Sequence, residues 1–399
     1  MNQELEGLRS RVLGRVDAVA GQLVEVSHRI HERPELNFEE HFASALLAEV
    51  ASKNGLVAER GAYGLETAVH GETGSGPVVC VMSEYDALPG IGHACGHNVI
   101  AAAGLGAAIA LAAVAGDAGG RLRWLGTPAE EGGGGKIIMA RNGALDSAEM
   151  AMMVHSAGHD LTTIDAIALR QLEFDFEGTE AHAAAAPHRG RNALDAAVLG
   201  YMGVAALRQH ILPTERVHGI FTRAGEKPNI VPKHASSQWY VRSDTMESLE
   251  ELTPRVVAAL EAGAHACGCT SRHRFPGETY ADLLANAEMS STWVRHAAEL
   301  GRSVGDPRSG GARVVGSTDM GNVSHLVPTI HPMIASAPPD AVIHTEDFAR
   351  HSRGPLADRA VVDGAKLLAL CALDFWTDPA LRSRTREEFA RTPRSHAVL

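Results

Sequence analysis

Apolar and polar positions follow two different rhythms in the first part of the chain. Residues 8–30 and 38–55 carry apolar side chains at helical spacing, and Pro34 breaks the pattern between them. Short apolar runs bounded by turn residues predict strands instead. The expected strands cover residues 67–69, 78–82, 121–125 and 150–154. Because strands alternate with helical segments, the pattern predicts an α/β domain.

Two further helices are expected between these strands. Residues 101–115 form the most apolar run of the chain, but they are rich in Gly and Ala and too few to cross a membrane, which takes about 20 residues. They predict a buried helix that packs tightly on a sheet. The other helix is expected at residues 136–142, before the strand that ends on His155.

The pattern changes at about Asp165. Residues 166–177 alternate between apolar and polar positions, which is typical of a strand with one buried face. The elements expected after it are a helix at 193–208, strands at 217–223 and 236–241, and a helix at 248–264. This β-α-β-β-α order predicts an α+β sandwich with a half-exposed antiparallel sheet. We interpret it as an inserted domain of residues 166–282, because residues 281–301 return to the helical pattern of the first part.

The remaining domain therefore comprises residues 1–165 and 283–399. Its second segment contains strand and loop material, expected at residues 314–325, 330–334 and 342–348. A long helix at about 357–375 closes the fold, and the Arg-rich tail from Arg382 is expected to be frayed. The amino-terminal helix carries charges throughout, without the apolar stretch or cleavage site of a secretion signal.

Composition and charge narrow the class of protein. Hydrophobic residues make up 45% and charged residues 21%, as in ordinary globular domains. The formal net charge is 36 − 48 = −12, which argues against nucleic-acid binding. Five scattered cysteines do not form a disulfide framework, so we expect a cytoplasmic protein. Cys267 and Cys269 form a lone C-x-C that we interpret as inert.

The densest chemistry lies directly after the strand at residues 78–82. Five ionisable side chains occur there within fourteen residues: Glu84, Asp86, His93, Cys95 and His97. In extended backbone Cys95 and His97 project to the same side, so this pair can bind one metal ion or bridge two. Three alternatives remain open: a buried, inert Cys, a histidine that only forms hydrogen bonds, and a cysteine hydrolase with Cys95 as the nucleophile.

Three of the expected strands deliver ionisable residues at their carboxyl ends. Cys95 and His97 follow the first, Glu130 and Glu131 follow the second, and His155 ends the third. Ligands of parallel α/β sheets bind in the crevice outside the carboxyl ends of the strands. The pattern therefore favours a metal site at this edge of the sheet.

Six motifs in order show a resemblance to a known family along nearly the whole chain. They are HERPELNFEE, SEYDALPGIGHACGHN, GTPAEEGGGGK, GTEAHAAAAPHRGRNA, NIVP and IHTEDFA. Together they resemble the dinuclear metallopeptidases of clan MH, the relatives of carboxypeptidase G and aminoacylase. Within that clan, the chain looks most like the amidohydrolase branch: hippurate, auxin-conjugate and aminobenzoyl-glutamate hydrolases and the β-alanyl-lysine dipeptidase type.

The resemblance implies an α/β catalytic domain with a mixed sheet and an inserted α+β sandwich that serves as a lid and dimerisation domain. It also implies two divalent metal ions per subunit, of zinc, manganese or cobalt. The implied ligands are Cys95, His97, Glu131, His155 and His344. His344 is chosen over its neighbours His325, His331 and His351 by its place in H-T-E-D-F. One departure from the wider family is Glu84, which stands where most members have a ligand His.

The same resemblance implies roles in catalysis. A divalent ion lowers the pKa of bound water from 15.7 to roughly 7, and Glu130 would accept the proton. The charge of two ions exceeds that of the surrounding anions, which favours substrates with a carboxylate. His182 would polarise the scissile carbonyl, often across a dimer. The remaining implied roles are substrate binding for Asn229 and Arg242, ligand orientation for Asp86 and an outer position for Asp319.

The sequence thus predicts a two-domain metallohydrolase that cleaves the amide bond of an N-acyl amino acid or a dipeptide. We expect a small-molecule substrate, a homodimer joined through the inserted domain, and neither a nucleic-acid nor a membrane partner. A hydrolytic deaminase on the same scaffold and a cysteine hydrolase using Cys95 are the alternative enzymes. A metal-bound scaffold without activity is the non-enzymatic alternative.

Overall fold

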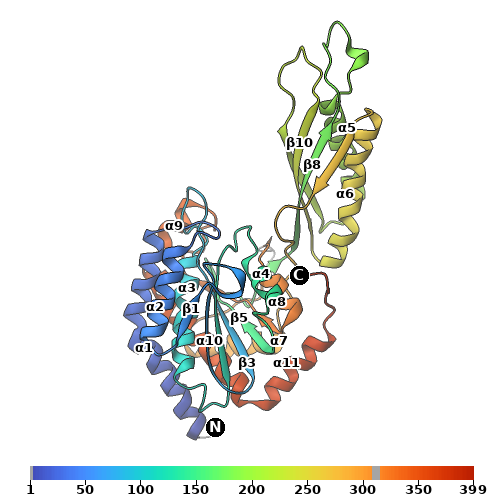
Figure 1. Cartoon of the computed structure of the whole chain (residues 1–399). Coiled ribbons are helices and arrows are strands. Elements are labelled where there is room, and N and C mark those ends of the chain that lie inside the picture. Colours follow the sequence, from blue (N-terminus) through green and yellow to red (C-terminus); the bar gives the residue numbers. More distant parts are fainter. Residues whose placement is uncertain (1–2, 308–314) are drawn as a thin grey trace. The chain divides into compact units, whose positions relative to one another are not determined.

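The chain forms two compact units in the computed structural model, which describes residues 3–307 and 315–399. Unit 1 comprises Met1–Asp165 and Leu283–Leu399, and unit 2 comprises Ala166–Asp282 (Figure 1). The expected element at 314–325 begins outside the described residues, at Val314. Among the described residues, no helix is both long and apolar enough to span a bilayer.

Unit 1 is organised around a six-stranded sheet. Its strand order is β1 (Ala58–Arg60), β2 (Val69–Gly74), β4 (Arg121–Thr127), β3 (Val78–Glu84), β5 (Ala148–Met152) and β13 (Thr329–Ile330). β3 runs parallel to both β4 and β5, whereas β2 is antiparallel to β1 and β4. The mixed sheet agrees with the expected fold class. A short parallel pair, β6 (His155–Ala157) and β14 (Met333–Ala335), follows beyond it.

Strand β3 is buried on both faces because helices cover both sides of the sheet. Val79 and Val81 join one apolar cluster, whereas Val78, Cys80 and Met82 join another, as the two-residue period of a strand requires. The first cluster contains α1 (Gln3–Glu32), α2 (His41–Lys53), α3 (His97–Ala112) and α10 (Pro355–Thr377). The second contains residues of α4 (Gly135–Arg141) and α8 (Met320–Leu326).

Helix α3 confirms the buried, tightly packed helix expected from the Gly/Ala-rich run. A Cβ atom at Gly104 would lie 2.2 Å from Ser83 Oγ and 2.6 Å from the carbonyl oxygen of Met82. Only glycine therefore permits this close approach of α3 to β3. The approach fixes the amino-terminal end of α3, which begins at His97, beside the carboxyl end of β3.

Unit 2 has an antiparallel sheet in the order β11 (Thr270–Arg274), β8 (Ala168–Glu177), β10 (His234–Ser243) and β9 (Arg216–Arg223). Helices α5 (Ala193–Leu207) and α6 (Met246–Ala266) pack on it and on each other. Alternate residues of β8 and β10 are buried, so the half-exposed sheet expected from the sequence is confirmed. Strand β11 was not expected.

One expectation for the carboxyl-terminal part is wrong. The tail from Arg382 is not frayed, because α11 (Pro379–Arg391) extends to Arg391. The carboxylate of Glu388 accepts hydrogen bonds from the backbone N–H groups of Ala287 and Glu288, at the start of α7 (Ala287–Glu299), and so ties the tail down. Of the strand and loop material expected at 342–348, residues 342–345 form loop, and α9 (Glu346–His351), capped by Thr345, begins after them.

The other elements are short. They are β7 (Asp165–Ala166), β12 (Val315–Gly316) and the 3₁₀ turns η1 (Ala62–Gly64), η2 (Pro187–Arg189) and η3 (Arg208–His210).

Candidate metal centre

The carboxyl ends of β3 and β4, the start of β6 and the loop before α9 bring the five expected ligands together. One group of donor atoms, from Cys95, His97 and His155, lies within 4.8 Å of one another. A second group within the same limit comprises Cys95, Glu131 and His344. Cys95 belongs to both groups, so its thiol would be shared if each group held an ion. All five residues named from the resemblance thus converge.

The separations between donor atoms suit metal coordination. Around a tetrahedral zinc ion, bonds of about 2.0–2.3 Å put neighbouring donor atoms about 3.3–3.6 Å apart. Cys95 Sγ lies 3.6 Å from His155 Nε2 in the first group. His344 Nε2 lies 3.2 Å from Glu131 Oε1 in the second. The two groups therefore have nearly the spacing that coordination needs.

Hydrogen bonds on the far side of each imidazole fix which nitrogen faces the cluster. His97 Nδ1 lies 3.1 Å from Asp86 Oδ1, and His155 Nδ1 donates to the carbonyl oxygen of Ser156 at 2.7 Å. The Nε2 atoms of both rings consequently point inward as lone-pair donors. The other oxygen of Asp86 accepts the backbone N–H of Glu131 at 2.9 Å. Asp86 thus contacts two of the expected ligand residues, which is the arrangement that an orienting role would need.

Buried polar atoms without a partner provide an independent test of whether the residues fit a metal. Within the described part of the chain, Glu84 Oε1, His97 Nε2 and Glu131 Oε1 are buried and have no hydrogen-bond partner. Leaving such a group unsatisfied costs roughly 1–3 kcal/mol, and more where it is charged. Three unsatisfied acceptors in one cluster are explained if cations bind between them. The residues present therefore fit divalent ions.

Burial controls the electrostatics of the cluster. It raises the pKa of the Cys95 thiol, so a thiolate is stable here only beside a cation. Burial, together with the charges of Glu84 and Glu131, raises the pKa of Glu130 well above its usual value. Burial also opposes protonation of His97, but the carboxylates of Glu84 and Asp86 outweigh it and raise the pKa of this imidazole.

His344 is distinguished from its neighbours in sequence by position alone. His325 Nδ1 accepts the backbone N–H of Ser395, and His351 is half-buried beside Asp347. His331 is buried against His155, with ring centroids 5.4 Å apart, but it belongs to neither group of donor atoms. The motif-based choice of His344 therefore coincides with the histidine that reaches Glu131.

A buried network lies behind the cluster; from the sequence, Asp319 was expected to hold an outer position, but Lys136 had no expected role. Lys136 Nζ lies 2.7 Å from Glu84 Oε2 and 2.7 Å from Asp319 Oδ1. All three side chains are buried. Glu84, Glu130 and Asp319 also form a group of carboxylates within 4.8 Å of one another. The GGGGK run was the available signal, because it carries a lysine five residues after Glu131.

The three remaining site residues lie in unit 2, and only two of them lie together. His182 forms a bridge with Ile230, and the backbone N–H of Ala183 donates to the carbonyl oxygen of Asn229 at 3.1 Å. His182 Nδ1 accepts the backbone N–H groups of Ala184 and Ala185. In the neutral ring, the proton therefore resides on the exposed Nε2, which is available as a donor.

Arg242 lies at the opposite end of the sheet of unit 2. It is eight residues beyond His234 on β10, a separation of roughly 26 Å at the usual rise of a strand. Its neighbour Ser243 pairs with Ala168, at the end of the sheet where the chain enters unit 2. Arg242 and Asn229 of one subunit are therefore too far apart to bind the same small substrate.

The loop between Cys95 and His97 depends on its glycine. Gly96 has a φ of +73°, and a Cβ atom there would lie 2.2 Å from Ser156 Oγ. Gly90 has a similar φ of +78° but nothing within 4 Å, so it is a matched control. We expect Gly90→Ala to cost about 1–2 kcal/mol for the left-handed backbone, and Gly96→Ala a further 1–3 kcal/mol for the clash. Urea unfolding of both variants measures the difference in their free energies of unfolding. Equal losses of stability would contradict the clash expected between a Cβ atom at residue 96 and Ser156.

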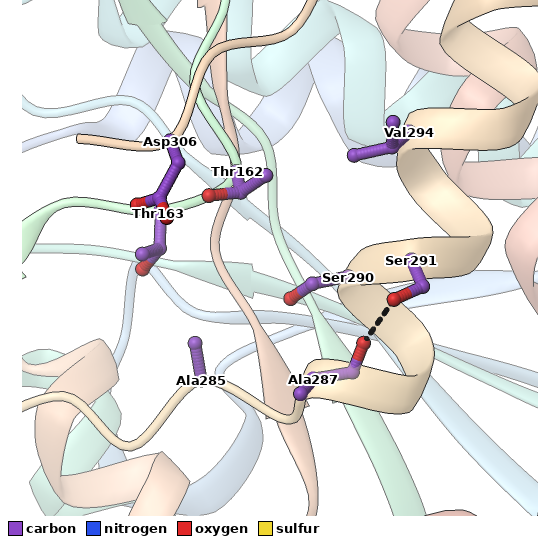
Figure 2. A pocket seen from close by; sticks show the side chains of 8 residues that line it. All are labelled: Thr162, Thr163, Ala285, Ala287, Ser290, Ser291, Val294 and Asp306. Carbon is purple, nitrogen blue, oxygen red and sulfur yellow. Dashed lines mark hydrogen bonds between the residues drawn. The ribbon is translucent and has the colours of Figure 1, made fainter. Parts of the chain in front are cut away.

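A pocket elsewhere in unit 1 lacks the chemistry of the metal centre. Figure 2 shows this pocket of about 380 Å³, in which the hydroxyl of Ser291 donates to the carbonyl oxygen of Ala287. Its lining residues are Thr162, Thr163, Ala285, Ala287, Ser290, Ser291, Val294 and Asp306. They include one ionisable side chain and none of the expected site residues, so the metal centre remains the candidate site.

Comparisons with known proteins agree with the fold and the motifs. The profile of peptidase family M20/M25/M40 matches residues 80–373. A mouse protein named Xaa-Arg dipeptidase is 37% identical over 401 residues, covering 97% of this chain and 93% of that protein. An Escherichia coli protein named as one of the subunits of p-aminobenzoyl-glutamate hydrolase is 32% identical over 282 residues, covering 65% of this chain and 59% of that protein.

A solved structure supports the same fold. A Bacillus subtilis protein described as a dinuclear metal binding peptidase of the M20 family matches with a TM-score of 0.69 at 17% identity. The match covers 90% of this chain and 98% of that one. The resemblance inferred from six motifs is thereby confirmed. The chain belongs to peptidase family M20/M25/M40 and is a hydrolase of that family.

Proposed function

We propose that this chain is a metal-dependent amidohydrolase that cleaves the amide bond of a dipeptide or an N-acyl amino acid. One observation carries the proposal: the five expected ligands form two donor groups that share the thiol of Cys95. Two divalent ions held there would supply Lewis acidity and lower the pKa of water to roughly 7. Zinc suits the site better than manganese or cobalt does, because thiolate and imidazole are ligands that zinc prefers.

The residues around the two donor groups have separate roles in proton transfer and in orienting the ligands. Glu130 shares a cluster with His97 and Glu131, so it lies within reach of water bound between the ligands. It accepts the proton from the attacking water and passes it to the leaving amine. Asp86 holds His97 and the backbone of Glu131 in the orientation that binding needs. Asp319 acts indirectly, because its carboxylate accepts a hydrogen bond from Lys136.

Dipeptides with a carboxyl-terminal Arg are the first substrate class to test. The 37% identical relative is named for that activity, and the match spans almost the whole of both proteins. The net charge of −12 on the whole chain attracts a cationic side chain at longer range. The five free cysteines suit a cytoplasmic enzyme.

We also propose a homodimer joined through unit 2. Strand β9 lies at the edge of its sheet and exposes Ile220 and Phe221, with exposed fractions of 64% and 40%. Val198, Leu199 and Met202 of α5 are exposed as well, and Tyr201 of that helix contacts Phe221. The other edge strand, β11, has the sequence TSRHR, whose charges discourage pairing. The apolar edge is thus the one suited to pairing with a second copy.

Metal dependence is the experiment that tests the proposed activity. Protein dialysed against a chelator should lose turnover of a panel of Xaa-Arg dipeptides and N-acyl amino acids, and added zinc should restore it. Release of the amino acid is measured by mass spectrometry and release of ammonia in parallel. Full activity of metal-free protein together with inactivation by a thiol alkylator would instead support a cysteine hydrolase. Ammonia as the product would support a deaminase.

A further inference from the structure

Glu84 faces the metal centre but has no role in the function proposed above. Its Oε1 atom lies 3.3 Å from His97 Nε2 and 3.9 Å from His155 Nε2. Among the described residues this oxygen has no hydrogen-bond partner, and the side chain is fully buried. Neither of these two contacts has hydrogen-bond geometry. The lone pairs on the two Nε2 atoms would therefore face the carboxylate oxygen of Glu84 with no proton or cation between them, which is unfavourable. A cation between the three atoms resolves that arrangement.

The other oxygen of Glu84 is fixed from behind. Oε2 accepts Lys136 Nζ at 2.7 Å, and the same ammonium donates to Asp319 Oδ1 at 2.7 Å. The second oxygen of Asp319 accepts the backbone N–H of Lys136 at 2.9 Å. Lys136 is therefore held at two points, and it directs Oε1 of Glu84 towards the donor atoms. Ordering of this kind is typical of the outer partners of metal ligands.

We propose that Glu84 is a further ligand, binding the ion that Cys95, His97 and His155 hold; this inference rests on the proposed function. The separation of 3.3 Å from His97 Nε2 matches that of neighbouring donor atoms around one zinc ion, about 3.3–3.6 Å. Lys136 and Asp319 position Glu84 without touching the ion. The position at which the wider family has a histidine ligand thus keeps a ligand of another type.

With Glu84 as a sixth ligand, the two ions receive different numbers of protein donor atoms. The first receives four protein donors, from Glu84, Cys95, His97 and His155. The second receives three, from Cys95, Glu131 and His344. Four protein donors are typical of structural zinc, whereas three leave a position for water or substrate. The first ion is accordingly the more tightly bound, and the second is the one that substrate reaches.

Zinc titration of the full-length protein tests this inequality. Samples are dialysed against chelator-buffered zinc over a wide range of free concentration, and zinc per chain is measured by mass spectrometry. Wild type should lose its ions in two steps. Glu84→Gln should weaken the tighter step by at least about 100-fold, because removing even an outer partner of a ligand costs about 10–100-fold. Glu215→Gln is the matched control and should leave both steps unchanged, since within the described residues this buried carboxylate accepts hydrogen bonds from Leu212 and Ser248 of unit 2.

A second variant covers the case in which Glu84→Gln does not fold. Glu84→Asp keeps a negative charge beside Lys136 but withdraws the oxygen by one methylene, and should weaken the same step. Wild-type zinc curves for both variants would overturn the inference and leave the proposed function intact; Glu84 would then be only the buried ion-pair partner of Lys136. A wild-type protein that binds no zinc would overturn the inference and the proposed function together.

Discussion

Glu130→Gln is expected to lower kcat by about 10²–10⁴-fold while the protein keeps its full complement of metal. Proton transfer by a positioned carboxylate contributes a factor of this size. The structure sharpens the test, because Glu130 belongs to clusters with His97 and Glu131 and with Glu84 and Asp319, but not to the two groups that contain Cys95. Removing its charge should therefore stop proton transfer without removing a donor from either group.

Glu131→Gln provides the matched comparison, since the change is identical and one residue away. Glu131 Oε1 lies 3.2 Å from His344 Nε2, within the second donor group, so this variant should lose one metal ion. The measurements are kcat for the best dipeptide and metal per chain. If Glu130→Gln loses metal and Glu131→Gln keeps it, the two roles are reversed.

Mixing two inactive variants, His182→Ala and Glu130→Gln, is expected to restore roughly a quarter of wild-type activity. The expectation rests on the dimer proposed through β9. Antiparallel pairing of two β9 strands about a two-fold axis would bring the Asn229 end of one sheet beside the Arg242 end of the other. His182 and Asn229 would then serve the partner's active site, and Arg242 that of its own subunit. This arrangement also accounts for the separation of Arg242 from Asn229 within one chain.

The size of the effect follows from the role proposed for His182. Its Nε2–H is free to donate to the carbonyl oxygen as charge develops, since Nδ1 is occupied by two backbone N–H groups. Losing one such donor costs about 10²–10³-fold in kcat. After random exchange half of the dimers are mixed, and each mixed dimer has one intact site. Verified exchange without recovered activity would mean that His182 serves its own subunit or none.

Two controls keep this experiment specific. His188→Ala changes another exposed histidine of the same segment and should retain full activity by itself. Ile220→Lys places a charge on the apolar edge of β9 and should yield monomers in sedimentation. If those monomers stay fully active, catalysis does not need a residue from the partner.

The elements with a local signal could be predicted from the amino-acid sequence alone. Strand β3 and helix α3 were predictable because a short apolar run and a Gly/Ala-rich run each specify one kind of burial. The candidate ligands Cys95, His97, Glu131 and His155 follow strand ends, which converge in any parallel arrangement. Motif position selected His344 among four nearby histidines, although nothing in the local pattern distinguishes them.

Features that depend on distant partners became visible only in the folded chain. The tail after Arg382 looks too polar to be ordered, yet Glu388 caps α7 about 100 residues earlier in the chain. Glu84 looks like a lost ligand until Lys136 and Asp319, which lie 183 residues apart, are seen to hold it towards His97. The physical reason is the same in both cases. A charged side chain has no preferred role of its own, and its role depends on which donors, acceptors and cations the folded chain brings to it.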